Sequence, residues 1–357
     1  MSRVFERLDA LYAIGGGPGA NRPHGSPAED EAHALAAEWM REAGLEVEVD
    51  RHGNLFGHVP GTDPGTGPVW AGSHLDTVPR GGRFDGALGV VAALEAVERA
   101  RAGSVVVFRG EEVGCVGSRA LVAAGGPLPR AFLELHVEQG PVLAERGVPL
   151  GVVTGIVGYA RGELVVVGRP GHAGTTPMAG REDALVAAAA EVLRVRDAAL
   201  ALPGAVATVG RLDVEPGAVN VIPSRVRLSL DVRAPEAGTL DELIGAIGFV
   251  PTQRVEPVLL AGRARDALAA SVRTAGVELV ELPSGAGHDA GILAAAGVDA
   301  SMLFVRSLAG GVSHCPEEES SEEDVALAIE VLTAALVRLA RYEGSRYSKT
   351  PAPDVPA

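Results

Sequence analysis

Short apolar runs alternate with amphipathic helical patterns along most of the chain, and this order restricts the fold more than any other feature of the sequence. Apolar runs over 69–73, 105–108 and 132–135 are separated by helical patterns over 86–101 and 118–124. A strand followed by a helix usually leads to a parallel strand of the same sheet. The order therefore predicts an α/β fold with a mostly parallel sheet and helices on its faces.

The middle of the chain follows a different pattern. Over 225–233, apolar and polar residues alternate strictly. A period of two is typical of an antiparallel sheet with one covered face. The covered face would carry Val226, Leu228, Leu230 and Val232.

This change of pattern predicts a discontinuous domain organisation. We expect a catalytic domain over 1–158 and 255–345 and an inserted α+β domain, ferredoxin-like with an antiparallel sheet, over 159–254. The proline-containing tail over 346–357 is expected to be disordered.

Two helices outside the alternating segment are expected over 26–43, opened by Ser26, and over 322–342. The first would bury Ala32, Leu35, Ala36 and Trp39, and the second would begin in a capping box, Ser321-Glu322-Glu323-Asp324.

The charge balance excludes several classes of partner. The chain has 46 acidic and 31 basic residues, a formal charge of -15. Nucleic acids and anionic membranes would be repelled, and no apolar run approaches the roughly 18 residues of a membrane-spanning helix.

Only Cys115 and Cys315 are cysteines, and the N-terminus lacks a signal-peptide pattern. We expect a cytoplasmic protein with a small-molecule substrate and without a nucleotide cofactor.

Polar residues follow the buried strands where those strands end. His74, the pair Glu111 and Glu112, and His136 each come directly after an apolar run or at its end. Ligands bind at the carboxyl ends of parallel strands, so these side chains are expected to converge on one edge of the sheet. Histidines and carboxylates gathered there are typical of a metal site, although a solvated Glu-Glu pair and an ordinary histidine are the alternatives.

Two aspartates extend this candidate site. In His74-Leu75-Asp76, alternate residues of an extended chain share a side, so Asp76 could take the second imidazole N–H and fix which nitrogen faces a metal. Asp85 precedes the 86–101 helix, where it could be a helix cap or a metal ligand. Glycine-rich segments around His288 and His314 follow later apolar runs, and Cys315 could be a thiolate ligand or a small passive side chain.

Seven motifs in this order resemble the N-carbamoyl-L-amino-acid hydrolase, β-ureidopropionase and allantoate amidohydrolase group of the dinuclear aminoacylase and carboxypeptidase clan. Among them are a motif over 72–89 that begins Gly-Ser-His-Leu-Asp and includes Asp85, Gly-His-Ala-Gly-Thr-Thr-Pro-Met at 171–178 and Ser-His-Cys-Pro-Glu-Glu at 313–318. The resemblance runs from Ala20 to Arg341. The other motifs begin at Glu134, Asn220, Asp231 and Ser284.

The resemblance implies a role for each matching residue. One divalent ion would be held by His74, Asp85 and His136, and a second by Asp85, Glu112 and His314. Glu111 would be the general base, and Asp76 would orient His74. Zn, Mn, Co and Ni all suit such ligands. Substrate recognition would fall on Gln139, His172, Asn220, Arg233 and His288.

The expected reaction is hydrolysis of a ureido C–N bond, converting an N-carbamoyl-L-amino acid to the amino acid, CO2 and NH3. Glu111 would move the proton, His172 would stabilise the oxyanion, and Arg233 would pair the substrate carboxylate. The resemblance also implies that the inserted domain acts as a lid and forms a homodimer. Allantoate or another ureido acid, an N-acyl amino acid or peptide, and a non-catalytic binding role are the alternatives. The segments after Glu112 and before Ser284 are shorter than in the family.

Overall fold

The computed structural model describes residues 2–61 and 68–347. The chain divides into two compact units, Met1–Gly155 with Leu259–Ala357, and Ile156–Val258. The domain boundaries proposed from the sequence, at 158/159 and 254/255, lie inside strands β7 (Gly158–Val167) and β12 (Pro251–Val255).

The first unit is built on a sheet that has nine strands among the described residues, in the order β1-β2-β4-β3-β5-β15-β6-β13, with β14 paired to β6. The four central strands β4, β3, β5 and β15 are mutually parallel, and antiparallel strands flank them. The predicted α/β fold with a mostly parallel sheet is therefore confirmed. The strands are β1 (Glu46–Val49), β2 (Leu55–His58), β3 (Val69–His74), β4 (Ser104–Phe108), β5 (Ala131–Val137), β6 (Leu150–Ile156), β13 (Val258–Leu259), β14 (Val280–Ser284) and β15 (Asp299–Val305).

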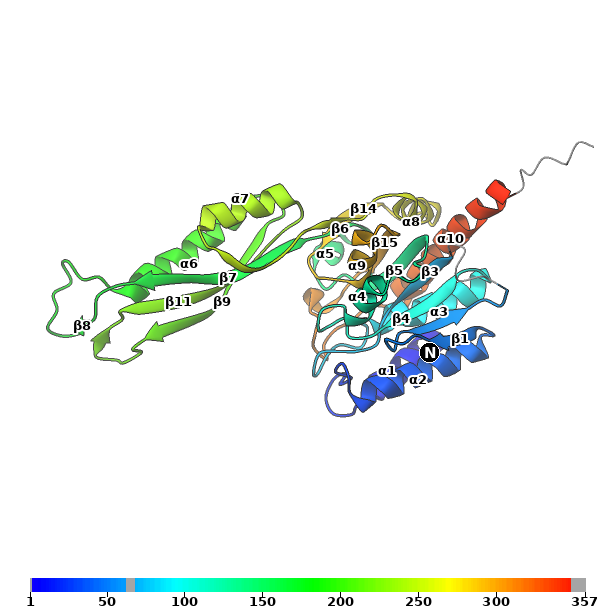
Figure 1. Ribbon diagram of the computed structural model, residues 1–357, viewed down its shortest axis with the longest axis horizontal. Coiled ribbons are helices and arrows are strands. Elements are labelled where there is room, and N and C mark those ends of the chain that lie inside the picture. The colour runs from blue at the N-terminus through cyan, green and yellow to red at the C-terminus, as the bar shows by residue number, and fades with distance from the viewer. Residues whose placement is uncertain (1, 62–67, 348–357) are drawn as a thin grey trace, which may run out of the picture. The chain divides into compact units, whose positions relative to one another are not determined.

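Helices cover both faces of this sheet (Figure 1). One face is covered by α3 (Ala87–Ala100), α8 (Arg263–Thr274) and α10 (Glu322–Tyr347), whose apolar side chains form the main core with Leu133, Leu135 and Val137 of β5. The opposite face carries α4 (Val116–Ala123) and α9 (Asp289–Ala295). Alternate residues of β5 point to opposite faces. Glu134 and His136 therefore lie on the side away from the main core.

The helix expected over 26–43 is α2 (Pro27–Glu42), and the Ser26 hydroxyl caps it by accepting the N–H of Glu29 at 3.2 Å. Its buried face is rotated from the expected one. Ala32 and Ala36 are buried as expected, whereas Leu35 and Trp39 are only half-buried. The other buried positions of this helix are Glu29, His33, Ala37 and Met40.

The helix expected over 322–342 continues to Tyr347, and the Ser321 hydroxyl accepts the Asp324 N–H at 3.1 Å, as in the predicted cap. The part of the proposed tail from 348 on lies outside the described residues. Five helices of the described residues were not expected from the sequence: α1 (Arg3–Ala13), α5 (Val142–Arg146), α7 (Ala237–Ile247), α9 and the 3-10 turn η1 (Ala309–Gly311). Across the described part of the chain, no helix combines the length and apolar character that crossing a bilayer requires.

The second unit is an antiparallel sheet of order β12-β7-β11-β9, with the helices α6 (Ala184–Leu200) and α7 (Ala237–Ile247) packed on one face. The predicted alternation is confirmed in β11 (Arg225–Ala234), because Val226, Leu228, Leu230 and Val232 are all buried. The strand β9 (Val206–Glu215) forms one edge. A small ribbon joins β8 (Gly171–His172) to β10 (Val221–Ile222).

Candidate metal centre

The carboxyl ends of the parallel strands carry the cluster of polar residues. His74 is the last residue of β3, Glu111 and Glu112 follow the end of β4, and His136 is the penultimate residue of β5. Asp85 lies in the loop that leads into α3, and His314 lies in the loop after η1. Strand ends and loops at this edge therefore supply all of these side chains, as the sequence predicts.

Among the described residues, two groups of three side chains could each hold a metal ion. One group is His74, Asp85 and His136, and the other is Asp85, Glu112 and His314. Within each group, one possible ligand atom per residue lies within 4.8 Å of the others. Asp85 belongs to both groups.

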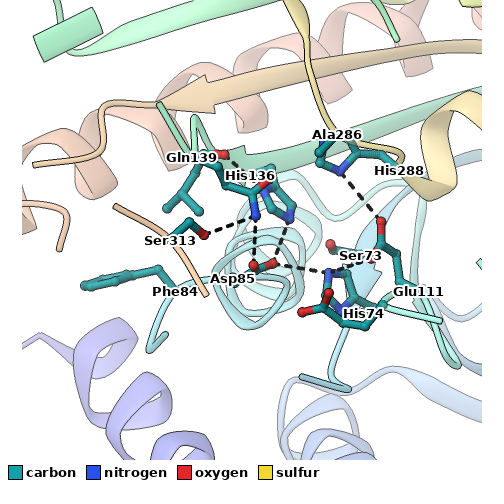
Figure 2. A network of polar contacts seen from close by, with 12 residues as sticks. Ser73, His74, Phe84, Asp85, Glu111, His136, Gln139, Ala286, His288 and Ser313 are labelled. Atoms are coloured by element: carbon teal, nitrogen blue, oxygen red, sulfur yellow. Dashed lines mark hydrogen bonds and ion pairs between the residues drawn. The ribbon is translucent and has the colours of Figure 1, made fainter. Parts of the chain in front are cut away.

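The carboxylate of Asp85 is arranged to bridge the two groups. Its Oδ1 lies 3.5 Å from Nε2 of His74 and 3.2 Å from Nε2 of His136. Its Oδ2 lies 3.2 Å from Nε2 of His314. Figure 2 shows His74 and His136 beside this carboxylate. One oxygen of Asp85 thus faces each group.

The buried imidazole nitrogens of the first group fit a metal ion. Nε2 of His74 and Nε2 of His136 are both buried and have no hydrogen-bond partner among the described residues, even though each is close to Asp85. If both nitrogens bound the same cation as Asp85, they would lie close to its carboxylate in this way without a hydrogen bond to it. Buried polar atoms otherwise cost about 1–3 kcal/mol each when unsatisfied. Histidine nitrogens with carboxylate oxygens are suitable ligands for divalent transition metals.

The side chain of Asp76 links His74 to the glutamate pair. Nδ1 of His74 lies 3.4 Å from Oδ1 of Asp76 and 3.1 Å from the Asp76 backbone carbonyl oxygen. The two carboxylate oxygens of Asp76 accept the backbone N–H groups of Glu111 at 3.0 Å and Glu112 at 3.1 Å. With Nδ1 directed at Asp76, Nε2 of His74 faces the candidate ion.

Glu111 lies beside the first group without belonging to it. Its Oε2 lies 3.8 Å from Nε2 of His74, and its Oε1 lies 3.9 Å from Nδ1 of His288. Burial raises the pKa of Glu111 well above its ordinary value, and the nearby carboxylates of Asp289 and Asp85 act in the same direction. A carboxylate with a raised pKa next to a metal centre can take a proton and return it.

The charged groups around Asp85 shift one another's pKa. Burial opposes ionisation of Asp85, but the imidazoles of His136, His314 and His74 outweigh it and hold its pKa well below the ordinary value. The ion pair with Asp85 raises the pKa of His314 to about 9. In the metal-free protein at neutral pH, a protonated His314 therefore lies beside an ionised Asp85.

Gln139 and His288 lie at the centre, and both side chains make hydrogen bonds there. The Gln139 amide donates to Oδ2 of Asp85 at 2.9 Å and to the Ser313 hydroxyl at 3.1 Å. His288 is buried, with Nε2 at 2.8 Å from the Ser284 hydroxyl and its ring 4.6 Å from that of His136. Cys315 belongs to neither described ligand group.

The other expected substrate residues lie in the second unit. His172 pairs with Val221 in the β8–β10 ribbon, and the Asn220 carbonyl accepts the Ala173 N–H at 3.0 Å. Arg233 pairs with Asp231, with Nε at 2.8 Å from Oδ1. In β11, Arg225 is opposite Val167 and Arg233 is opposite Tyr159, which places Arg233 at the far end of the sheet from His172.

Among the buried charged residues near the centre that were missed from the sequence are Arg22 and Glu318. Arg22 is 1% exposed and donates from Nε to the Leu75 carbonyl oxygen at 2.8 Å, between His74 and Asp76. Glu318 is 5% exposed and contacts the Asp85 loop. Arg22 lies in a loop without periodicity, and Glu318 lies in an acidic run, so neither has a local signal of burial.

Comparisons with known proteins agree with this geometry. A model of peptidase family M20/M25/M40 matches residues 70–338. The N-carbamoyl-L-amino acid amidohydrolase of Geobacillus stearothermophilus is 36% identical over 406 residues, covering 96% of this chain and 99% of that protein. The allantoate amidohydrolase of Bacillus subtilis is 32% identical over 364 residues, covering 84% of this chain and 88% of that protein.

Solved structures agree as well. The crystal structure of an amidase of the hydantoinase/carbamoylase family from Burkholderia multivorans has a TM-score of 0.89 and 29% identity, covering 95% of this chain and 97% of that chain. The resemblance seen in the motifs is therefore confirmed, and the chain belongs to the peptidase family M20/M25/M40.

Proposed function

We propose that this amidohydrolase cleaves the ureido C–N bond of an N-carbamoyl-L-amino acid and releases the amino acid, CO2 and NH3. The observation that carries the proposal is the position of Glu111, whose side chain is 9% exposed and lies beside two candidate metal groups of which it is not a member. A protein that only bound its ligand would not need a base there. The names of the amidohydrolase relatives support the bond class.

Seven residues carry the chemistry in this proposal. The ligand roles fall on the two groups described above, and Asp76 orients His74. Two bound divalent ions would supply Lewis acidity and lower the pKa of the attacking water towards neutrality. Glu111 takes the proton of that water as it attacks the carbamoyl carbon, and then gives the proton to the leaving nitrogen. The ligands are His74, Asp85, Glu112, His136 and His314.

Substrate recognition is proposed for polar residues of both units. The guanidinium of Arg233 suits the α-carboxylate because its planar fork can pair both oxygens. His172 is the proposed donor to the oxyanion, an effect worth a few kcal/mol per donor. Asn220 would hold the carboxylate with Arg233, and Gln139 and His288 would contact the ureido group.

We infer a homodimer through the second unit, because His172 lies in the β8–β10 ribbon, which follows the Val167 end of β7, whereas Arg233 lies at the opposite end of β11. The two side chains of one copy cannot both reach one small molecule. From Arg225, opposite Val167, to Arg233, the chain of β11 advances by eight residues, about 26 Å at 3.3 Å per residue. A second copy would supply the missing residue. Val186, Leu193 and Leu200 form an exposed apolar stripe on α6, 67%, 53% and 77% exposed, next to the edge strand β9. A dimer would cover both surfaces.

Hybrid dimers test this arrangement. His172→Ala and Arg233→Ala should each abolish most activity. When the two inactive variants are mixed and allowed to exchange subunits, half of the dimers are hybrids with one complete site, so about a quarter of the wild-type activity should return. Absence of recovery despite proven exchange would contradict the shared site.

The substrate itself is tested by ammonia release. The purified chain is reconstituted with Zn, Mn, Co or Ni and assayed against N-carbamoyl-L-amino acids, their D-isomers, allantoate and N-acetyl amino acids. Fastest turnover of an N-carbamoyl-L-amino acid supports the proposal. Preference for allantoate would assign the activity named for the Bacillus subtilis relative, and preference for N-acetyl substrates would exclude ureido specificity.

The two cysteines, both free, and the acidic charge fit our proposal that the enzyme works in the cytoplasm.

A further inference from the structure

A buried carboxylate outside the two ligand groups holds the loop of Asp85. Oε2 of Glu318 accepts the backbone N–H groups of Phe84 and Asp85, each at 3.3 Å. The side chain is buried, although Glu318 is far from both residues in the sequence. These two bonds fix the backbone from which the Asp85 carboxylate projects, which Figure 2 shows beside Phe84.

Gly82 makes room for this carboxylate. A Cβ atom at position 82 would overlap the Glu318 carboxylate, and the other close atoms there also belong to Glu318. The φ angle of Gly82 is not in the left-handed region, so its backbone would allow another residue. The glycine is therefore required by the space that Glu318 fills.

The segment that carries Glu318 also carries His314. The Glu318 N–H donates to the Cys315 carbonyl oxygen at 3.2 Å, which turns the chain back after His314. The same segment is attached to the end of β15, because the Ser320 hydroxyl donates to the Arg306 carbonyl oxygen at 2.9 Å. Glu318 therefore joins the loop of Asp85 to the loop of His314.

This link affects the two ligand groups unequally. In the first group, His74 and His136 belong to strands of the central sheet, and only Asp85 depends on the loops. In the second group, both Asp85 and His314 lie in the joined loops, and His314 is half-exposed. Weakening the link should therefore disturb the second group more than the first.

We propose that Glu318, which packs against Gly82, is a positioning residue that fixes the position of Asp85 relative to His314. It thereby sets the affinity of the second ion, the one assigned to Asp85, Glu112 and His314. The inference rests on the dinuclear assignment of the proposed function. It does not depend on which substrate is hydrolysed.

Metal titration of the full-length metal-free chain tests the proposal. Mn2+ binding is followed by calorimetry, and Co2+ binding by its visible absorption, in wild type, Glu318→Ala and Glu318→Gln. In Glu318→Ala the second ion should bind about 10–100-fold more weakly, the usual cost of losing an outer-shell partner, while the first ion changes less than about threefold. Glu318→Gln keeps an acceptor oxygen and should lie between the two. Glu317→Ala and Glu319→Ala are the matched controls, because both neighbours are exposed, and they should behave as wild type.

Gly82→Ala supplies an independent test. It should displace the Glu318 carboxylate and weaken the second ion in the same way, and adding Glu318→Ala to it should cost little more, because the contact is already lost. Gly126→Ala is the control, since nothing lies within 4 Å of its Cβ. Additive effects of Gly82→Ala and Glu318→Ala would overturn the proposal.

Activity at excess metal separates this role from general damage to the fold. Saturating Mn2+ should restore kcat of Glu318→Ala to within about threefold of wild type. Equal weakening of both ions, or an unchanged second ion, would overturn the positioning role. A wild-type chain that binds two ions without releasing ammonia would refute the proposed function alone. A wild-type chain that binds fewer than two ions would refute the inference as well.

Discussion

The carboxylate of Asp76 accepts the backbone N–H of Glu111 at 3.0 Å, and this single bond joins the orientation of His74, a proposed metal ligand, to the position of the proposed base. Nδ1 of His74 lies 3.4 Å from the same carboxylate oxygen. The other oxygen accepts the N–H of Glu112. Asp76 therefore arranges three residues of the centre at once, one from β3 and two from the loop after β4.

Replacing Asp76 should impair metal binding and turnover together. Asp76→Ala leaves two backbone N–H groups without their acceptor and removes the carboxylate beside Nδ1 of His74, so we expect metal affinity to fall about 10–100-fold. Metal content after dialysis and kcat at saturating metal measure the two effects. Because the Glu111 loop also moves, excess metal should restore kcat only in part. Full recovery at high metal would limit Asp76 to the orientation of His74.

Replacing Glu111 should abolish turnover and spare the metals. Glu111→Gln keeps the shape of the side chain but cannot take a proton, so kcat should fall by about 10²–10⁴-fold. Metal content should remain that of wild type, because Glu111 is in neither ligand group. The adjacent Glu112→Gln is the matched control and should lose metal. An active Glu111→Gln variant would show that another group is the base.

Metal uptake should release protons. The ion pair with Asp85 raises the pKa of His314 to about 9, so this imidazole is protonated in the metal-free protein at neutral pH. His314 must lose that proton to bind a cation. For each proton released, the metal affinity should therefore rise about tenfold per pH unit as the pH increases towards 9. Calorimetry in buffers of different ionisation enthalpy counts the protons. His314→Gln should release fewer, and an affinity of the wild type that does not vary between pH 6 and 8 would contradict the assignment.

Arg233 should act on substrate binding. Arg233→Lys keeps the charge but cannot pair both carboxylate oxygens, so KM for an N-carbamoyl amino acid should rise at least about tenfold with a smaller change in kcat. Arg161 also pairs with Asp231 and lies over Tyr159, and Arg161→Lys is the matched control. Equal effects of the two substitutions would point to disruption of their shared ion pairs.

The sequence predicts those parts of the fold and the centre that follow from periodicity and strand ends. The parallel sheet, the alternation in β11 and the gathering of His74, Glu111, Glu112 and His136 all arise from that local order. The contacts of Asp76 with two backbone N–H groups depend on the path of a loop. The burial of Glu318 depends on Gly82, more than two hundred residues earlier, so no local pattern could reveal it.

The face of α2 shows why burial is harder to predict than the helix itself. The expected apolar stripe placed Leu35 and Trp39 inward, but His33 is fully packed and these two are only half-buried. The helix turns its Ala and Met side chains to the core, where small residues allow close approach, and His33 lies on that same face. A polar residue at such a position gives no sequence signal of burial.

His33 should make the protein sensitive to mild acid. Burial, with the Arg109 guanidinium nearby, lowers the pKa of His33 to about 3, and neither ring nitrogen has a hydrogen-bond partner among the described residues. The unfolded chain takes up this proton near pH 6.5, whereas the folded chain stays neutral, so the stabilisation is fully present above pH 6.5 and is lost as the pH falls towards 3. Between pH 6 and 5 the free energy of unfolding should fall by about 1 kcal/mol more in wild type than in His33→Leu.

Urea unfolding of the metal-free chain at both pH values measures this difference, because removing the metals excludes changes in ligand binding. The half-buried His52 is the control, and His52→Gln should keep the wild-type slope, since His33 is unchanged in it. If His33→Leu and wild type lose stability in parallel between pH 6 and 5, the acid sensitivity does not come from His33, and its imidazole must be able to take up a proton within the fold.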